Sequence, residues 1–324
     1  MGLTMLNVFF TIDVEVWLEE WKRKERFPFD FRRYVYGPTK GGEYGLPFKL
    51  KVFQDYGISA SFFVESLFAS FFGVEPLKEI IGLIKEKDQE IQLHMHTEWV
   101  EKLENSILGN RKISEFGKFS SREINCLLET AMKNIQAAGV DTVKAYRGGN
   151  YQISPDILKA LALNRISIDT SYNPCSLEAC SKIHPDGLLL NPKKINGIIE
   201  YPVSAFRDFW GHLRPMQISA SSYGEMTHFL WKAVEKNFDA VVIVSHNFEL
   251  MDPRQAKADS IVVKRFIKLC QFLDKNRDVF RSVGFNQANH PTEFAIKQIV
   301  PSNFQKNITR LVEQGTRNFF YGLN

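Results

Sequence analysis

Two histidines and a glutamate occupy alternate positions in the stretch Ile91-Gln-Leu-His-Met-His-Thr-Glu-Trp99. Successive side chains of a β-strand point to opposite faces, so His94 and His96 would share one face, and Glu98 would continue the row if the strand extended that far. Imidazole and carboxylate groups are common ligands of zinc in proteins. The spacing therefore favours a metal site. The alternative is a pair of partly buried histidines that only hydrogen-bond the backbone.

A second group of ionisable residues ends an apolar run near the start of the chain. Asp13 and Glu15 lie two positions apart in Phe10-Thr-Ile-Asp-Val-Glu-Val-Trp17, and a strand would place both on one face. Repulsion between two close carboxylates raises the pKa of one of them unless a cation or an arginine offsets it. Such a pair indicates a functional site more often than a structural need, although a solvated strand end would also accommodate it.

Polar residues also end three further apolar runs. In a barrel of parallel strands, the carboxyl ends of all strands meet on one face, which is where such enzymes place their active sites. Convergence at the same end of several strands is hard to explain by packing. The residues expected to converge, from five strands, are Asp13, Glu15, His94, His96, Arg147, Asp169 and His246.

The elements that would position these residues alternate along nearly the whole chain. Short β-branched and aromatic runs are followed by segments of helical period, which is typical of βα units around a mostly parallel sheet. We predict an α/β fold, a distorted (β/α) barrel of seven to eight mostly parallel strands. The candidate strands are 6–13, 57–64, 90–95, 143–147, 165–170, 197–203, 240–245 and 279–285.

Helices are predicted between these strands, and two segments lie outside the regular pattern. Residues 1–290 would form the barrel and residues 291–324 a helical tail packed on it. Residues 18–50 are predicted as an irregular loop insertion that covers the site. The predicted helices are 76–87, a helix that follows the capping residues Ser120 and Ser121 and ends near Gly139, 155–163, 224–236 and 260–275.

Composition restricts the classes of protein and partner. The 324 residues are 44% hydrophobic and 24% charged, as in ordinary globular proteins. The net charge of +4 is spread among carboxylates, so no nucleic-acid partner is expected. No apolar run is long enough for a transmembrane segment, and the tail offers only a weak alternative as an amphipathic helix in peripheral contact with a membrane.

The beginning of the chain and its cysteines predict a cytoplasmic location. No signal peptide precedes the first strand. Cys126, Cys175, Cys180 and Cys270 show neither zinc-ribbon spacing nor the density of a disulfide scaffold, so reduced thiols are expected. None of them ends a strand of the site, and no Gly-x-Ser-x-Gly segment exposes a serine. Thiol and serine nucleophiles are therefore not supported.

Five ordered segments resemble the successive motifs of the polysaccharide deacetylases, carbohydrate esterase family four. The resemblance implies a distorted barrel that removes N- or O-acetyl groups from sugars with a divalent metal, usually zinc. The segments are Thr11-Ile-Asp-Val-Glu15, Leu93-His-Met-His-Thr-Glu-Trp99, Tyr146-Arg-Gly-Gly-Asn-Tyr151, Ile168-Asp-Thr-Ser-Tyr172 and Ser245-His-Asn-Phe-Glu-Leu250.

The same resemblance implies roles for individual residues. Asp13 is similar to the catalytic base of the family, and Arg147 to the arginine that holds that base. His246 corresponds to the histidine that protonates the leaving amine, and Asp169 to the acid that aligns it. His94 corresponds to the first metal-binding histidine.

Two positions depart from the family pattern. Val14 follows Asp13 where the family has a second, metal-binding aspartate, and Glu15 on the same face is the expected substitute. Glu98 occupies the position of the second histidine, so either His96 or Glu98 would complete the metal set. Zinc is the first expectation, and a set rich in carboxylates leaves manganese or cobalt open.

The expected function is removal of an acyl (acetyl) group from an N-acylated sugar of a polysaccharide or its precursor. Trp17, Trp99, Asn150 and Tyr151 are expected to bind the saccharide, because flat rings suit the apolar faces of sugars. Two alternatives stay open. One is hydrolysis of another amide, such as a formamido sugar or a ureide, and the other is a metal-free barrel that only binds saccharide.

Overall fold

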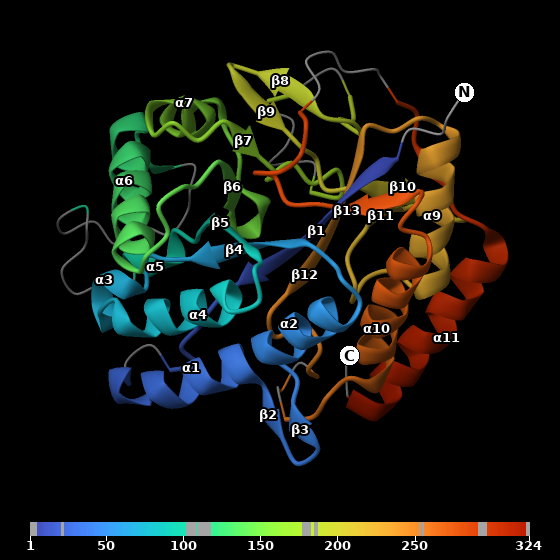
Figure 1. Cartoon of the computed structure of the whole chain (residues 1–324), viewed down its shortest axis with the longest axis horizontal. Helices are drawn as coiled ribbons and strands as arrows, with labels where there is room; N and C mark the ends of the chain where they lie inside the picture. The colour runs from blue at the N-terminus through green and yellow to red at the C-terminus, as the bar shows by residue number, and fades with distance from the viewer. Residues whose placement is uncertain are drawn as a thin grey trace.

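A curled, mostly parallel sheet of nine strands forms the centre of the molecule (Figure 1). The spatial order is β12-β1-β4-β5-β6-β7-β9-β8, and β13 also pairs with β1. Helices surround the sheet, as in the predicted α/β barrel. The computed structural model describes residues 5–20, 23–101, 108, 118–176, 183–184, 187–252, 254, 256–290 and 297–321.

Every candidate strand range overlaps one parallel strand of this sheet. The antiparallel strand β8, which pairs with β9 at the sheet edge, was not among the candidates. The strands are β1 (Leu6–Val14), β4 (Ala60–Glu65), β5 (Glu90–Met95), β6 (Ala145–Gly148), β7 (Ile168–Asp169), β8 (Lys193–Ile195), β9 (Ile198–Glu200), β12 (Ala240–His246) and β13 (Phe280–Ser282).

Successive side chains of each strand point alternately into the interior of the curled sheet and toward its helix-covered side. On β1, Phe10 and Ile12 belong to the large core under the helices, whereas Phe9 belongs to the interior cluster. Asp13 lies four residues after Phe9 and therefore continues the same inward row. The interior cluster consists of Phe9, Phe63, Ala145, Ile168, Tyr201, Val203, Ala240, Val242, Val244, Val283 and Phe285.

Hydrogen bonds connect the segment that follows β9 with β12, which lies at the other edge of the curled sheet. The Ser204 N–H donates to the Val242 carbonyl at 3.2 Å, and the Ser204 Oγ accepts from the Val242 N–H at 2.9 Å. β12, next to β1 on one side, is thus linked on its other side to the segment that follows β9. The carboxyl ends of β1, β5, β6 and β12 consequently face one another.

Two of the predicted helices begin at serine N-caps. Ser120 and Glu123 form a capping box on α6, and the side chain of Ser154 accepts from Ile157 N–H at the start of α7. The helices are α1 (Phe27–Tyr36), α2 (Leu46–Asp55), α3 (Ala69–Phe72), α4 (Glu75–Lys85), α5 (Glu98–Glu101), α6 (Ser121–Ala137), α7 (Pro155–Leu163), α9 (Tyr223–Glu235), α10 (Ser260–Lys275) and α11 (Phe304–Tyr321), with short 3-10 turns at Lys24–Arg26 and Gly149–Tyr151.

The prediction that residues 18–50 are irregular was wrong for the described part of that segment. Helix α1 and the first half of α2 lie there. Phe27, Phe31 and Val35 recur at helical spacing and are buried, and this period is masked in the sequence by the surrounding Arg, Lys and Gly residues. None of the described residues 18–50 lines the pocket described below.

Two smaller sheets and α11 complete the described chain. β2 (Pro38–Thr39) pairs with β3 (Gly42–Glu43), and β10 (Ala205–Arg207) pairs with β11 (Leu213–Pro215) and β14 (Val300–Pro301). α11 contacts α9. Among the described residues, none of the helices has both the length and the apolar character needed to cross a bilayer. The division into residues 1–290 and 291–324 stays a prediction.

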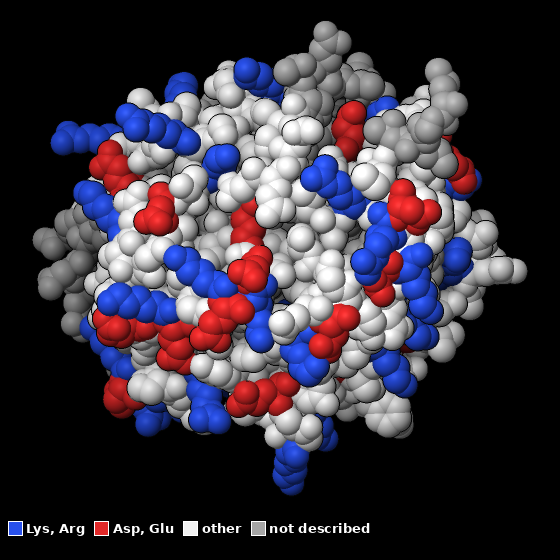
Figure 2. All heavy atoms as spheres, in the orientation of Figure 1, with Lys and Arg blue, Asp and Glu red and all other residues white. Residues whose placement is uncertain are grey.

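Charged side chains are mixed on the face of the molecule in Figure 2. Lys and Arg (blue) lie among Asp and Glu (red), with both signs present across the view. This distribution agrees with the spread of charge seen in the sequence. Cys126, Cys175 and Cys270 are free thiols, and Cys180 lies outside the described residues.

Candidate active site

A polar pocket of about 430 Å³ opens at the carboxyl ends of β1, β5, β6 and β12. Nearly all of its lining comes from the predicted site residues, so five of the seven residues expected to converge do meet here, whereas Arg147 and Asp169 do not line the pocket. The lining residues are Asp13, Glu15, Trp17, His94, His96, Glu98, Gly148, Asn150, Tyr151 and His246.

Glu15 lies at the centre of this pocket. Its Oε1 is 3.1 Å from His94 Nε2 and 3.1 Å from His96 Nε2. The three ligand atoms lie within 4.8 Å of one another, and all three residues are buried. Ligand atoms of a tetrahedral zinc site with bonds of about 2.0–2.1 Å lie about 3.3 Å apart. The separations therefore fit a divalent metal bound by Glu15, His94 and His96.

The hydrogen-bond partners of the two histidines support the same fit. His94 Nδ1 is 2.7 Å from the Arg147 carbonyl oxygen, so Nδ1 carries the hydrogen that this bond requires. In a neutral His94, the lone pair of Nε2 then faces a Glu15 oxygen. Two lone pairs repel each other unless a proton or a cation lies between them. The His94 Nε2 and Glu15 oxygen atoms are thus arranged to bind a cation between them.

Glu98 lies outside that cluster and contacts the other side of His96. Its Oε2 is 3.2 Å from His96 Nδ1, and its Oε1 accepts a hydrogen bond of 2.5 Å from Asn150 Nδ2. β5 ends at Met95 and the chain turns into α5 at Glu98, so Glu98 does not continue the strand row. A carboxylate on the far nitrogen of a metal-binding histidine is a common supporting contact.

The charges around Glu15 and His96 stabilise each other. Burial alone would raise the pKa of Glu15, but His96 and His94 hold that pKa well below its usual range. Burial alone would lower the pKa of His96, but Glu15 and Glu98 raise that pKa well above its usual value. The carboxylate form of Glu15 and positive charge beside it are both favoured in this pocket.

Asp13 and His246 form a second group next to the first. Asp13 Oδ1 accepts a 2.7 Å hydrogen bond from Arg147 Nη1, in a pair whose side chains are almost completely buried. His246 Nε2 is 3.8 Å from Asp13 Oδ2 and 3.8 Å from Glu15 Oε1. Arg147 is fixed in turn by Thr170, whose carbonyl accepts from Nε at 3.1 Å. One Asp13 oxygen is therefore occupied, and the other faces His246.

Asp169 does not occupy the position predicted for it. Its Oδ1 accepts from Ser171 Oγ at 2.6 Å, it pairs with Glu200 across the strands, and burial raises its pKa. It does not line the pocket. The acid next to His246 Nδ1 is Glu249, at 4.0 Å, and Glu249 Oε2 accepts from the His246 backbone N–H at 3.2 Å.

Only one of the two predicted tryptophans reaches the pocket. Trp17 lines it, donates from Nε1 to Glu15 Oε2 at 2.7 Å, and meets the His96 ring edge to face at 4.7 Å between centroids. Trp99 is 1% exposed and packs among phenylalanines of the core, including Phe68 and Phe71. The α5 turn directs Trp99 inward, which the sequence alone did not indicate.

The Gly-Gly-Asn-Tyr turn after β6 forms one wall of the pocket. A Cβ on Gly149 would lie 2.4 Å from His96 Nδ1, so only glycine permits this approach. Asn150 and Tyr151 have φ of 53° and 56°, a left-handed conformation that is rare for residues other than glycine. The Tyr151 hydroxyl is buried with no hydrogen-bond partner among the described residues. Such strain and unsatisfied groups concentrate at functional sites.

Two supporting residues were missed in the sequence. The Asn247 side chain accepts from the Glu15 N–H and donates to the Glu15 carbonyl, both at 3.0 Å. Buried Glu65 accepts from the His96 N–H and from the Leu67 N–H at 2.6 Å. Burial raises the pKa of Glu65 to about 7. Asn247 directly follows His246, and Glu65 ends its strand, so position at a strand end was the available signal.

Together, the curled α/β sheet and the His–Glu cluster place a candidate metal site at the carboxyl edge of the sheet. The structure resembles a "putative polysaccharide deacetylase" from Mycobacterium smegmatis, with a TM-score of 0.53 and 16% identity over 88% of this chain and 89% of that chain. The resemblance inferred from the five motifs is thus confirmed at the level of fold. No protein-family model and no curated protein matches the sequence.

Other solved structures align at lower scores. A family 4 carbohydrate esterase from Streptomyces lividans, in complex with acetate, gives a TM-score of 0.43 at 9% identity and covers 91% of this chain and 98% of that one. A family 4 pseudoenzyme from Bacillus anthracis gives 0.37 at 12% identity, covering 83% of this chain and 62% of that one.

Proposed function

We propose that this protein is a metal-dependent amide hydrolase that removes an acetyl group from an N-acylated sugar of a polysaccharide or its precursor. The observation that carries the proposal is the convergence of His94 Nε2 and His96 Nε2 on one oxygen of Glu15. The Asp13–Arg147 pair and His246 in the same pocket supply the groups for proton transfer.

Glu15, His94 and His96 would hold the metal, with zinc as the first choice and manganese or cobalt as alternatives. A divalent ion bound there would supply Lewis-acid chemistry, which would polarise the acyl oxygen and would lower the pKa of a water to about 7. Glu98 orients His96 through Nδ1, and the Arg147 carbonyl orients His94 through Nδ1. These contacts keep both Nε2 atoms directed at the cluster.

Two residues would move the protons. Arg147 occupies Oδ1 of Asp13, which leaves Oδ2 to accept the proton of the water that attacks the acyl carbon. His246 Nε2, 3.8 Å from Asp13 Oδ2, then donates a proton to the amine nitrogen as the carbon–nitrogen bond breaks. Glu249 takes the place that the sequence assigned to Asp169, because it is the acid next to His246.

Three residues of the pocket lining would bind the sugar. The Tyr151 hydroxyl has an unsatisfied hydrogen-bonding capacity at the pocket wall, and a substrate hydroxyl or acyl oxygen could satisfy it. Trp17 contributes its indole ring to the pocket lining, and Asn150 lies next to Glu98. Flat rings with a few directed polar groups are typical of saccharide sites.

The test is metal content and product release with the same preparations. The purified chain, its His94→Ala variant and a matched control, His212→Ala at an exposed histidine outside the pocket, are analysed for bound metal and incubated with N-acetylated oligosaccharides. About one divalent ion per chain and acetate release, both lost only in His94→Ala, are the expected results. Formate release from formamido sugars in place of acetate would redirect the proposal to another amide.

The metal-free alternative has one observation in its favour. Both ring nitrogens of His96 face carboxylates, so a proton could bridge the cluster in place of a metal. Absence of metal uptake from added zinc, manganese or cobalt, together with saccharide binding in calorimetry, would overturn the hydrolase and leave a saccharide-binding barrel.

A further inference from the structure

The acid next to His246 is held by side chains that lie outside the pocket lining. Glu249 Oε1 accepts hydrogen bonds from Ser219 Oγ and from Gln217 Nε2, the second at 2.7 Å. Glu249 Oε2 accepts from the His246 backbone N–H at 3.2 Å, and Oε1 is 4.0 Å from His246 Nδ1. Neither Ser219 nor Gln217 lines the pocket. The direction of the Glu249 carboxylate is therefore set from outside the pocket.

The chain segment that carries both of these donors lies along β12. The Ile218 N–H donates to the Val244 carbonyl at 3.2 Å, and the Val244 N–H donates to the Met216 carbonyl at 2.9 Å. Val244 precedes His246 by two residues. The segment is thus bound to the strand that carries the proposed proton donor.

The Glu249 carboxylate carries a charge that its donors stabilise. Burial alone would raise the pKa of Glu249, but the charges of His246 and Lys49 and hydrogen bonds with Ser219 and Ser245 hold that pKa below its usual value. An ionised carboxylate only accepts hydrogen bonds, and a buried one that loses a donor is destabilised in that position. Removal of the Ser219 hydroxyl would therefore allow the carboxylate to turn away from His246.

Two buried arginines fix the Ser219 backbone, and one of them belongs to α11. Arg317 Nη1 donates to the Ser219 carbonyl at 3.0 Å, and its Nε donates at 2.6 Å to Asp259, the N-cap of α10. Arg265 Nη1 donates to the same Ser219 carbonyl at 3.1 Å, and Arg265 also pairs with Glu313 of α11 at 2.6 Å. Contacts of α11 thus determine where Ser219 lies.

We propose that Ser219 and Arg317 are positioning residues for His246, which act through Glu249. The Arg317 guanidinium fixes the Ser219 backbone, the Ser219 hydroxyl fixes the Glu249 carboxylate, and that carboxylate holds His246. This inference rests on the proposed function, because it concerns the alignment of the histidine with the leaving nitrogen. A displacement of about 1 Å at a reacting group can cost about 100-fold in rate. The C-terminal helix would then be needed for turnover, although none of its residues lines the pocket.

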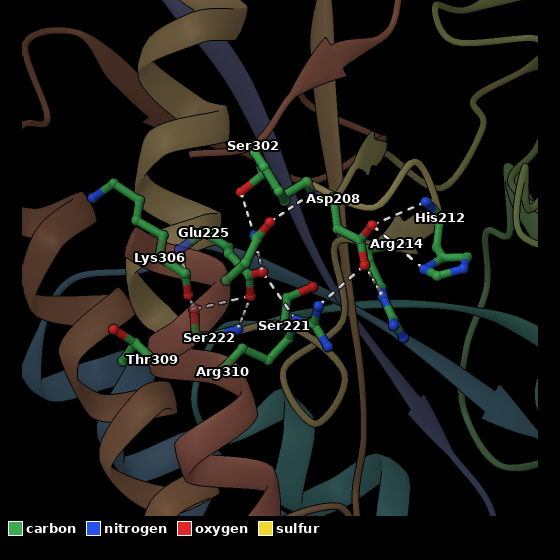
Figure 3. A network of polar contacts seen from close by, with 12 residues as sticks. Asp208, His212, Arg214, Ser221, Ser222, Glu225, Ser302, Lys306, Thr309 and Arg310 are labelled. Atoms are coloured by element: carbon green, nitrogen blue, oxygen red, sulfur yellow. Dashed lines mark hydrogen bonds and ion pairs between the residues drawn. The ribbon is translucent and has the colours of Figure 1, made fainter. Parts of the chain in front are cut away.

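Arg310 provides a matched comparison two turns earlier on the same helix. It is buried like Arg317, and it donates to Glu225 of α9 at 2.9 Å and to Asp208 in the β10–β11 turn at 3.1 Å (Figure 3). Replacement of either arginine by methionine removes the cation from a buried carboxylate, so both variants should lose stability. The hydrogen bond to Ser219, in contrast, belongs to Arg317.

The first test uses the full chain, supplied with zinc, and N-acetylated oligosaccharides. Ser219→Ala removes the donor to Glu249, and Ser219→Thr keeps a hydroxyl as the matched control. We expect kcat for acetate release to fall about tenfold in Ser219→Ala, with KM changed by less than about twofold. Ser219→Thr should keep the wild-type kcat. Well below the melting temperatures of both variants, Arg317→Met should lower kcat at least about threefold more than Arg310→Met.

The second test reads the His246 ring by NMR and does not need turnover. In a chain with isotope-labelled histidine, the His246 signals are identified by their absence in His246→Gln. We expect the Nδ1 and Nε2 signals of His246 to shift in Ser219→Ala and Arg317→Met. They should keep their wild-type positions in Ser219→Thr and Arg310→Met.

The proposal and the function on which it rests can fail separately. Shifted His246 signals in Ser219→Ala, without acetate release by any preparation including the wild type, would support the contacts and contradict the hydrolase. Wild-type kcat or unshifted His246 signals in Ser219→Ala would overturn the positioning role. Equal effects of Arg317→Met and Arg310→Met on kcat and on these signals would overturn the role of Arg317.

Discussion

The proposed mechanism assigns Glu15, His94 and His96 to metal binding and Asp13 and His246 to proton transfer. Asp13, Glu15 and His246 also have ligand atoms within 4.8 Å of one another, so this assignment needs a test. Asp13 contacts Arg147 and faces His246, but it is not one of the atoms around which His94 and His96 converge. We expect Asp13→Asn to abolish acetate release while bound metal stays near the wild-type amount, because the amide cannot accept the proton. Elemental analysis beside product assays measures both.

The same variant should also cost stability. Arg147 is completely buried, and loss of the partner charge typically destabilises by about 3–5 kcal/mol. Asp156→Asn, at an exposed pair with Lys159, is the control and should change the free energy of unfolding by less than about 0.5 kcal/mol. Wild-type turnover in Asp13→Asn would remove Asp13 from the mechanism.

Lys49 provides a pH-dependent prediction at a single buried side chain. Its Nζ donates to Ser245 Oγ at 2.8 Å, next to His246, and burial lowers its pKa from 10.5 to about 8. Between these two pH values the unfolded chain binds more protons at Lys49 than the folded chain, so stability rises with pH across this window. The gain is about 3 kcal/mol by the top of the window.

Lys49→Met, which has similar length and no charge, should lack this gain. Urea unfolding of both proteins below pH 8 and near pH 10.5 measures it. The free energy of unfolding of the wild type should increase relative to that of Lys49→Met as the pH rises. A difference that is independent of pH would mean that Lys49 is solvated or neutral throughout.

At the scale of elements, the turn that follows β6 determines the shape of the pocket. Gly149 lies against the His96 ring, and the following two residues hold left-handed φ angles. Gly149→Ala would push a Cβ into that ring, so we expect weaker metal binding together with a loss of stability. Gly82→Ala in α4, where a Cβ meets nothing within 4 Å, should instead stabilise by about 0.5–1 kcal/mol.

Metal affinity by competition with a chelator and melting temperature distinguish these two glycine variants. Equal metal affinity in Gly149→Ala and the wild type would show that the turn can relax without disturbing His96. The strain at Asn150 and Tyr151, of order 1–3 kcal/mol for each residue, would then have no role in holding the ligand.

The strands and the inward rows of the site could be predicted because both follow from the two-residue period. Asp13 and Glu15 prolong the row that begins with Phe9 in the apolar interior. Asp169 could not be placed, because β7 contains only two residues and the direction of its side chain depends on Glu200 of the next strand. The inward direction of Trp99 depended on a helix that begins directly after the strand.

At the scale of the whole molecule, α11 connects elements that are far apart in the sequence. Glu225, which Arg310 contacts, is also the capping-box residue of α9. Asp259, which Arg317 contacts, is the N-cap of α10. The sequence of the tail predicted a helix but not which side faces inward, because the partners of its arginines lie 58 to 102 residues away.

This arrangement predicts that the two sides of α11 contribute oppositely to stability. Arg310→Met leaves Glu225 and Asp208 buried beside no cation from α11, and breaking such a pair typically costs about 3–5 kcal/mol. Leu311→Ser, one residue further on and 44% exposed, should change the free energy of unfolding by less than about 0.5 kcal/mol. In an ordinary amphipathic helix the apolar residue would be the costly one, so urea unfolding of this adjacent pair tests directly whether α11 packs through its polar side, where Asn307, Arg310 and Arg317 are buried. A larger loss in Leu311→Ser than in Arg310→Met would show that α11 packs through its apolar side.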